Sequence, residues 1–430
     1  MVPISWRNWA GNVSDSAPTA TPTSIDELST MVREAASRGQ RIRVAGSGHS
    51  FSPVASSDGV RLSLARLGSS AVVADDGTSV TVPAGMTLRT LNRELDSRGL
   101  AVPNLGDIDA QTIAGAIQTG THGTGAAFGS LASFVSGLTL VQADGSVVTC
   151  GRGEPLFDAA VVGVGAFGVL ASVTLECVPA FVLRASERPA DLVSVLGDLD
   201  SFIASHDHFE FYWFPYTSRV QVKMNDRVEA SDRPLPGWRG WLDDSFLSNT
   251  VFGAGCRVAR RFPGFARPLL KVSARALSPR VYTAPSHEVF CTERRVRFVE
   301  MEYGLPRAAL EEAFAGLRSL VDKLPFNVAF PVEVRFTAPD EPWLSHGYGR
   351  ENAYVAVHQY VGMPYEPYFR EFEKICVGLG GRPHWGKMHF ASADALRAAY
   401  PKWPDWEAQR AKADPDGAFG NPWLDRLRGA

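Results

Sequence analysis

The first 180 residues show the hydrophobic periods of a unit that mixes helices and strands. Ser24 and Glu27 have the spacing of a capping box, and apolar residues then recur at helical intervals up to Gly39, which predicts a helix over residues 25–38. Leucines that share one face predict a second helix over residues 87–98. Short apolar or alternating runs predict strands over residues 41–45, 79–82, 138–142 and 147–150, with a hairpin between the last two.

Beyond Pro179 the pattern changes, and we expect a second unit over residues 181–430. Alternating positions predict strands of one large sheet, and helical patterns follow two of them. Residues 227–280 are rich in Pro, Gly and Arg, which predicts loops and short helices. The fold class expected from these patterns is α+β. The expected strands lie at residues 208–215, 294–303, 327–335 and 353–360, and the expected helices at residues 308–322 and 365–377.

Length and composition are those of a globular protein with two domains. The chain has 430 residues, of which 45% are hydrophobic and 21% are charged. A formal net charge of -3 gives no reason to expect a nucleic-acid or membrane partner, and no run of about 18 apolar residues predicts a membrane span. Five widely spaced cysteines without a CxxC pair indicate buried thiols in a reducing compartment. We therefore predict a cytoplasmic protein that acts on a neutral or weakly charged small molecule.

Three glycine clusters indicate that the backbone of the first unit approaches a ligand closely. They lie at residues 46–48, 120–125 and 163–168. Successive backbone N–H groups in such turns bind phosphates, so a dinucleotide cofactor is implied. The third cluster matches the GxGxxG spacing, but it comes late in the unit and lacks a βαβ pattern with an acidic residue about 20 positions on. Ordinary turn glycines explain that cluster better than a Rossmann site.

Three histidine-containing segments are candidates for chemistry. His49 lies inside the first glycine turn, where a ring suits a nucleophile or a cofactor anchor, although most histidines are ordinary surface or core residues. His122 has a similar setting in the second cluster, where the backbone matters more than the ring. His384 and His389 are five residues apart without a nearby Cys or carboxylate, so we predict no metal site. Lys387 between them fits a partly desolvated lysine that stabilises negative charge, or simply a turn whose tryptophan packs on the core.

Glu333 and Arg335 project to the same face of an apolar strand, because they are two residues apart. Charges flanked by Val and Phe are costly to bury unless they pair or bind something. A structural ion pair and a role in a site therefore stay equally open. His358, on the next expected strand, adds a third polar group that could share that face.

Three motifs in order resemble the sugar-lactone oxidoreductase branch of the vanillyl-alcohol-oxidase flavoprotein family. They are GSGHSFSP at residues 46–53, TGTHGTG at residues 119–125 and HWGK at residues 384–387. The resemblance covers nearly the whole chain, and three motifs in order are more specific than any one alone. It implies an FAD-binding domain of the PCMH type over residues 1–180. It also implies a cap over residues 181–430 with a large antiparallel sheet, whose C-terminal tail returns towards the FAD domain.

The resemblance also implies residue roles. His49 would carry a covalent link to the flavin 8α-methyl group, and Glu333, Arg335, His358 and Lys387 would line the substrate pocket. Thr112 replaces a serine found near the flavin in alditol oxidases, which argues against strict alditol specificity. The implied flavin contacts are Gly46, Ser47, Gly48, Ser50, Thr112, Gly115, Gly120, Thr121, His122, Gly123, Gly168, His384 and Lys387.

The implied activity is oxidation of a CH–OH group of a sugar-derived substrate, such as an aldonolactone, by hydride transfer to FAD. Lys387 and Arg335 would supply positive charge, and His358 or Lys387 would accept the hydroxyl proton. Two alternatives stay open. One is oxidation of another hydroxylated donor, an alditol or a nucleoside, with dioxygen as acceptor. The other is a non-catalytic flavin or sugar-binding protein. These residues do not indicate whether dioxygen or another acceptor takes the electrons.

Overall fold

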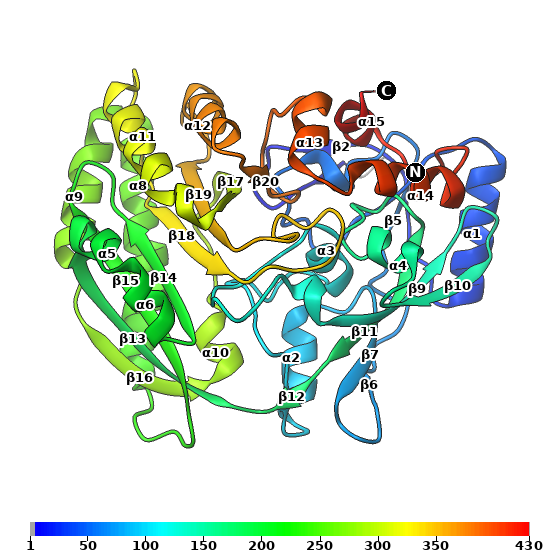
Figure 1. The fold of residues 1–430 in the computed structure, drawn as a ribbon, viewed down its shortest axis with the longest axis horizontal. Coiled ribbons are helices and arrows are strands. Elements are labelled where there is room, and N and C mark those ends of the chain that lie inside the picture. Colours follow the sequence, from blue (N-terminus) through cyan, green and yellow to red (C-terminus); the bar gives the residue numbers. More distant parts are fainter. Residues whose placement is uncertain (1–4, 430) are drawn as a thin grey trace.

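The structure, a computed structural model, describes residues 5–429 and places two groups of sheets side by side (Figure 1). In the N-terminal group, three short strands run parallel: β3 (Thr19–Ala20), β5 (Val60–Leu62) and β4 (Ile42–Val44). A five-stranded antiparallel sheet lies beside them, in the order β10 (Val147–Gly151), β9 (Val135–Val141), β11 (Val169–Glu176), β7 (Ser79–Pro83) and β6 (Val72–Val73). Two-stranded pairs join β1 (Trp6–Arg7) to β2 (Ser14–Asp15) and β12 (Val178–Pro179) to β8 (Leu100–Ala101).

The helices of this half confirm the local sequence signals. The first begins after Ser24, whose hydroxyl accepts the backbone N–H of Glu27 at 3.1 Å, as the capping box predicts. Leu28 and Val32 then face the core. The hairpin between β9 and β10 also lies where it is expected. The helices are α1 (Ile25–Ser37), α2 (Leu88–Asp96), α3 (Ile113–Gln118) and α4 (Pro155–Ala160).

An eight-stranded antiparallel sheet forms the second group. Its order is β16 (Arg280–Pro285), β13 (Val182–Asp191), β15 (Arg219–Val228), β14 (His208–Trp213), β18 (Val332–Thr337), β19 (Asn352–Tyr360), β17 (Phe298–Pro306) and β20 (Arg382–Pro383). One face is apolar and packs against α5 (Leu192–Gly197), α6 (Leu199–Ser205), α11 (Leu310–Lys323) and α12 (Glu366–Gly378). The other face carries charged side chains at alternate positions.

Two strands begin later than the alternation predicts. β18 starts after Pro331, because proline has no N–H to donate within a central strand. β17 starts at Phe298, the position that pairs with the last residue of β19. Upstream of it, the Arg295 N–H donates to Asn249 Oδ1 at 2.7 Å instead of to a neighbouring strand.

Residues 227–280 are more helical than expected. α7 (Gly237–Gly240), a π-helix (Trp241–Val251) and α8 (Phe252–Arg261) follow one another without a break, and α9 (Ala266–Ala276) comes after a short turn. α8 and α9 pack on the charged side of the large sheet through Phe330 and Tyr212. The glycines and prolines that suggested loops lie largely at the ends of these helices.

The C-terminal segment packs against the N-terminal sheets. It contains α13 (Ala393–Ala399), α14 (Trp403–Ala413) and α15 (Pro422–Arg428). The Ile42 N–H donates to the Ala418 carbonyl at 2.7 Å, and the Arg43 guanidinium donates to the Phe419 carbonyl at 2.8 Å. All five cysteines have free thiols. Among residues 5–429, no helix is both long and apolar enough to cross a bilayer.

Candidate active site

The first glycine turn presents a row of backbone N–H groups. The N–H of Ala45 donates to Leu62 at 3.0 Å and that of Phe51 donates to Gly386 at 2.7 Å, whereas the amides of residues 46–50 donate to no group of the described chain. Gly48 has a φ of 72°, a left-handed conformation that aligns successive N–H groups. Such a concave row of donors fits a pyrophosphate.

Gly46, Thr112 and Gly115 lie together beside this row, so the structure unites three of the expected flavin contacts. A Cβ on Gly46 would come within 2.3 Å of Thr112 Oγ1, and therefore only glycine allows this approach. The Thr112 hydroxyl in turn accepts the Gly115 N–H at 3.3 Å and caps α3. Gly46, Ser47 and Gly115 are exposed, although Ala45, Ala114 and Ala116 beside them in the chain are buried. The chemistry of this surface fits the dinucleotide portion of FAD.

His49 belongs to this turn and is half-buried. Its ring stacks on Trp9 with a centroid distance of 5.6 Å. Burial, together with the charges of Lys387 and Arg89, lowers the pKa of His49 and favours the neutral ring. A neutral imidazole has the free nitrogen lone pair that a covalent anchor requires. Ser50, its chain neighbour, is half-buried, and its carbonyl accepts the Asn8 side-chain amide at 2.9 Å.

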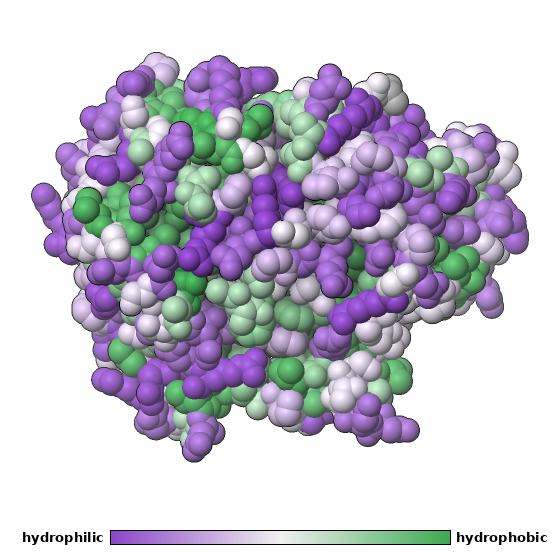
Figure 2. Space-filling view, in the orientation of Figure 1, coloured by the Kyte–Doolittle hydropathy of each residue, from purple (hydrophilic) through white to green (hydrophobic). Residues whose placement is uncertain are grey.

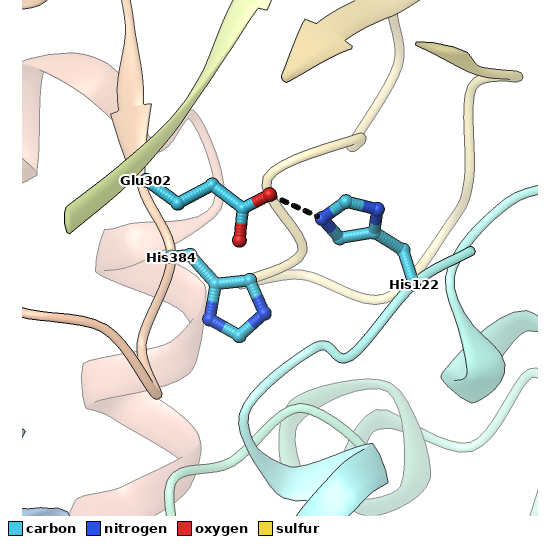
Figure 3. Close-up of side chains that lie close together, drawn as sticks. All are labelled: His122, Glu302 and His384. Atoms are coloured by element: carbon cyan, nitrogen blue, oxygen red, sulfur yellow. Dashed lines mark ion pairs between the residues drawn. The ribbon is translucent and has the colours of Figure 1, made fainter. Parts of the chain in front are cut away.

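The second glycine cluster is buried beneath the site. Gly120, Thr121 and Gly123 are all buried, and His122 stacks on Tyr354 with a centroid distance of 3.6 Å. His122 Nδ1 lies 2.9 Å from the Gly123 carbonyl, to which it donates. Its Nε2 faces Glu302 Oε1 at 3.3 Å (Figure 3). This segment joins the two halves of the molecule through a side-chain contact as well as through its backbone.

His384 lies beside this pair in Figure 3, and its Nδ1 accepts the Gly386 N–H at 3.0 Å. Ligand-type atoms of His122, Glu302 and His384 lie within 4.8 Å of one another. Lys387 Nζ lies 3.9 Å from Glu302, so a cation already balances this carboxylate. We therefore interpret the cluster as a charge network.

Gly168, from the third glycine cluster, lies beside β9. It precedes β11, and a Cβ there would come within 2.8 Å of the Val141 carbonyl oxygen of β9. Close packing of two strands accounts for the glycine at this position.

Lys387 is tied to two carboxylates of β17. Its Nζ lies 2.5 Å from Glu300 Oε1, and its side chain is 21% exposed. His358 Nε2 lies 3.4 Å from the same oxygen, while His358 Nδ1 lies 3.1 Å from the Pro331 carbonyl, to which it donates. Burial opposes ionisation, but Lys387 and His358 lower the pKa of Glu300 to about 2. Likewise, Glu300 and Glu302 outweigh burial and raise the pKa of Lys387.

Arg335 lies at the centre of a second network on β14 and β18. Its guanidinium contacts Glu333, Asp107 and Glu210, the last at 2.8 Å. These three carboxylates outweigh burial and raise the pKa of Arg335 well above its ordinary value. Burial raises the pKa of Glu333, although Arg335 acts in the opposite direction. Tyr212 donates its hydroxyl to Glu333 at 2.7 Å.

The two networks meet, because side-chain atoms of Glu300, Glu333 and His358 lie within 4.8 Å of one another. The four residues expected in the substrate pocket, Glu333, Arg335, His358 and Lys387, therefore surround one region of the sheet. Sequence reasoning missed five charged neighbours. They are Asp107, Glu210, Lys223, Glu300 and Glu302.

The fold is expected to lose stability as the pH falls from 4.5, the ordinary pKa of glutamate, towards 2, in part through Glu300. Because the folded state lowers the pKa of Glu300, its ionised form stabilises the fold above pH 4.5, and this contribution disappears as the carboxylate protonates near pH 2. Urea unfolding midpoints between pH 7 and about pH 3 should fall less steeply for Glu300→Gln than for the unsubstituted protein. Glu34→Gln, which alters an exposed pair with Arg38, should leave the slope unchanged. Equal slopes in all three proteins would contradict the assignment.

A row of free amides in one half of the molecule, linked through Phe51 to the segment of the half-buried Lys387 and accompanied by the buried Arg335 of the large sheet, is the arrangement of an FAD-dependent oxidoreductase. Residues 17–151 match an FAD-binding domain and residues 173–427 match D-arabinono-1,4-lactone oxidase. Since the second match takes in more than half of the chain, the protein belongs to the D-arabinono-1,4-lactone oxidase family.

Full-length relatives agree with this assignment. The chain is 41% identical to an L-gulono-1,4-lactone dehydrogenase of Mycobacterium tuberculosis, and the alignment covers 100% of both chains. It is 32% identical to the L-gulonolactone oxidase of Bos taurus, with 99% of this chain and 98% of the relative covered. An alditol oxidase of a Streptomyces species is also 32% identical, with 98% of both chains covered.

Solved structures show the same fold at low sequence identity. A cholesterol oxidase from Brevibacterium sterolicum superposes with a TM-score of 0.83 over 98% of this chain and 96% of its own, at 18% identity. This likeness concerns the fold alone. It confirms the expected architecture, in which a PCMH-type FAD-binding domain carries a cap with a large antiparallel sheet.

Proposed function

We propose that this protein oxidises a CH–OH group of an aldonolactone such as L-gulono-1,4-lactone and transfers the electrons to dioxygen or another acceptor. The observation that carries the proposal is the convergence of Arg335, His358 and Lys387 on one region of the cap sheet, beside the turn that holds His49. The 41% identity to a lactone dehydrogenase supports the choice of substrate. We place the domain boundary near residue 180 and the protein in the cytoplasm, where five free thiols are stable.

FAD would be held by the amides of residues 46–50, by the Gly46, Thr112 and Gly115 surface, and by a covalent bond to His49. Bound there, it would supply the hydride acceptor. The turn is fixed to the lysine motif, because Phe51 donates to Gly386 and Ser52 donates to the Trp385 carbonyl at 2.6 Å. These two hydrogen bonds fix the position of the cofactor anchor relative to Lys387.

On the substrate side, His358 is the group best suited to accept the hydroxyl proton. Its Nδ1 donates to the Pro331 carbonyl, which leaves Nε2 as the nitrogen that would accept the proton, and Glu300, 3.4 Å from Nε2, would stabilise the resulting positive charge. The raised pKa of Lys387 favours its cationic form, which suits stabilisation of a developing alkoxide. Arg335 supplies a second cation, and Glu333 would accept a hydrogen bond from a substrate hydroxyl.

Loss of the covalent flavin is the expected result of replacing His49 by alanine. The unsubstituted protein should keep its yellow colour after acid precipitation, whereas His49→Ala should release the flavin into the supernatant. His206→Ala, which alters a surface histidine paired with Asp226, serves as the control and should keep the colour. Acid-stable colour in the His49 variant would contradict the anchor.

The substrate class can be tested by an anaerobic spectral screen of the purified protein. Lactones should bleach the flavin absorbance faster than alditols or nucleosides do. Faster bleaching by an alditol would favour the second candidate, to which the 32% identity with an alditol oxidase gives some support. Persistence of the oxidised spectrum with every donor would overturn the proposed activity.

A further inference from the structure

Exposed apolar side chains gather in one segment of the cap. Fifteen large hydrophobic side chains are exposed in residues 5–429, and nine of them lie between residues 238 and 272. All five exposed Trp and Phe side chains are in this group. Trp238 is 69% exposed, Trp241 60% and Phe262 60%. A concentration of this kind marks a contact surface, because exposed apolar residues are normally scattered.

The same segment is strongly basic. Residues 238–275 contain seven Arg or Lys and two Asp, a net charge of +5 in a chain whose net charge is -3. Both aspartates are engaged by Arg280, at 3.0 Å for Asp244 and 3.8 Å for Asp243. In the described part of the chain no ion pair involves the other basic residues of α8, α9 and the turn between them, namely Arg257, Arg260, Arg261, Arg267, Lys271 and Arg275.

The basic and apolar side chains lie on the outer sides of the two helices. α8 buries Gly253, Cys256 and Ala259, and α9 buries Ala266, Leu270 and Ala274. Their opposite faces carry Arg257, Val258 and Arg261, and Arg267, Lys271, Val272 and Arg275. Figure 1 places α8 and α9 at the left end of the molecule, away from both termini, and Figure 2 shows green surface areas at that end. The surface is therefore amphipathic and free of cover within this chain.

We propose that residues 238–275 form a docking segment for the surface of an anionic phospholipid bilayer. Aromatic and aliphatic side chains would enter the interfacial region, and the unpaired arginines would contact lipid phosphates. A nucleic acid would match the charge but not the exposed Trp, Phe and Val side chains between the cations, and an acidic protein would require a matching set of apolar pockets, whereas an anionic bilayer accepts both kinds of side chain at once. Binding of this type requires no membrane-spanning helix. The proposal does not depend on the enzyme's substrate.

The test is co-sedimentation of the full-length, flavin-loaded protein with lipid vesicles. Phosphatidylcholine vesicles are compared with vesicles that contain about one quarter phosphatidylglycerol, at low and at high salt. We expect about tenfold tighter binding to the anionic vesicles at low salt, and loss of this preference at high salt. Equal binding to neutral and anionic vesicles would overturn the proposal.

Two variants test the two halves of the surface. The first is Trp238→Ala with Trp241→Ala and Phe262→Ala, and the second is Arg257→Gln with Arg261→Gln, Lys271→Gln and Arg275→Gln. Each should weaken vesicle binding about tenfold and leave turnover of a soluble substrate unchanged. The matched controls alter exposed residues elsewhere, and should bind as before: Val72→Ala with Val147→Ala and Val193→Ala, and Arg33→Gln with Arg66→Gln, Arg93→Gln and Arg318→Gln.

Two further outcomes would overturn the assignment. If the controls weaken binding as much as the segment variants do, the effect is one of overall charge or hydrophobicity. If the unsubstituted protein does not bind the vesicles but forms dimers that the segment variants abolish, the surface is an interface with a second copy of the chain. Sedimentation velocity without vesicles distinguishes the second outcome.

Discussion

Lys387→Met is expected to lower the rate of flavin reduction by about 10²-fold to 10³-fold, the usual effect of removing one group that stabilises developing negative charge. The lysine is held by Glu300 at 2.5 Å, and its raised pKa favours the charged form at neutral pH. Methionine has a similar length but no charge, so binding of the flavin should persist. The rate is measured by anaerobic stopped-flow spectroscopy with a lactone donor.

Removal of the lysine also leaves Glu300 buried without its cation, which would destabilise the fold independently of catalysis. The double variant Lys387→Met with Glu300→Gln removes both charges and should recover the thermal midpoint without recovering the rate. Lys374→Met, which breaks an exposed pair with Glu371, should change neither quantity. A double variant with normal turnover would show that Lys387 is a structural residue.

Several elements of the fold and of the site could be predicted because their signals are local. The capping box set the start of α1 at Ile25, and the two-residue spacing set Glu333 and Arg335 on one face of β18. The same spacing rule applies to Glu300 and Glu302 in the run RRVRFVEMEY, which the alternation already predicts as a strand. These two glutamates could therefore have been found from the sequence.

Other partners depend on pairings that no local pattern encodes. Asp107 lies in a loop of the N-terminal half, yet it contacts Arg335 and, at 2.7 Å, Arg294. The register that sets Glu210 opposite Arg335 joins strands more than 100 residues apart in the chain. The basic residues of segment 238–275 were missed for another reason. The net charge of -3 describes the whole chain, in which the local charge of +5 is offset by the acidic remainder.

Arg335→Met is expected to destabilise the fold by about 3–5 kcal/mol at neutral pH, because three carboxylates would lose a buried cation. The three carboxylates are Asp107, Glu210 and Glu333, and all of them contact the Arg335 guanidinium. Lys223, at 2.6 Å from Glu210, and Arg294 would compensate only part of the charge. Urea unfolding of the variant, compared with Arg318→Met on the exposed surface of α11, measures the difference.

The stability that Arg335→Met loses should depend on pH, and in the direction opposite to that expected for Glu300. Burial already raises the pKa of Glu333, and removal of Arg335 takes away the main charge that lowers it. A carboxyl whose folded pKa is raised contributes stability below its unfolded pKa and loses it as the pH rises. The Arg335 variant should therefore recover part of its deficit near pH 5 and be weakest above pH 7, and Glu333→Gln in the same background should remove this dependence. A deficit that stays constant between pH 5 and 8 would show that packing, and not charge balance, is the contribution of Arg335.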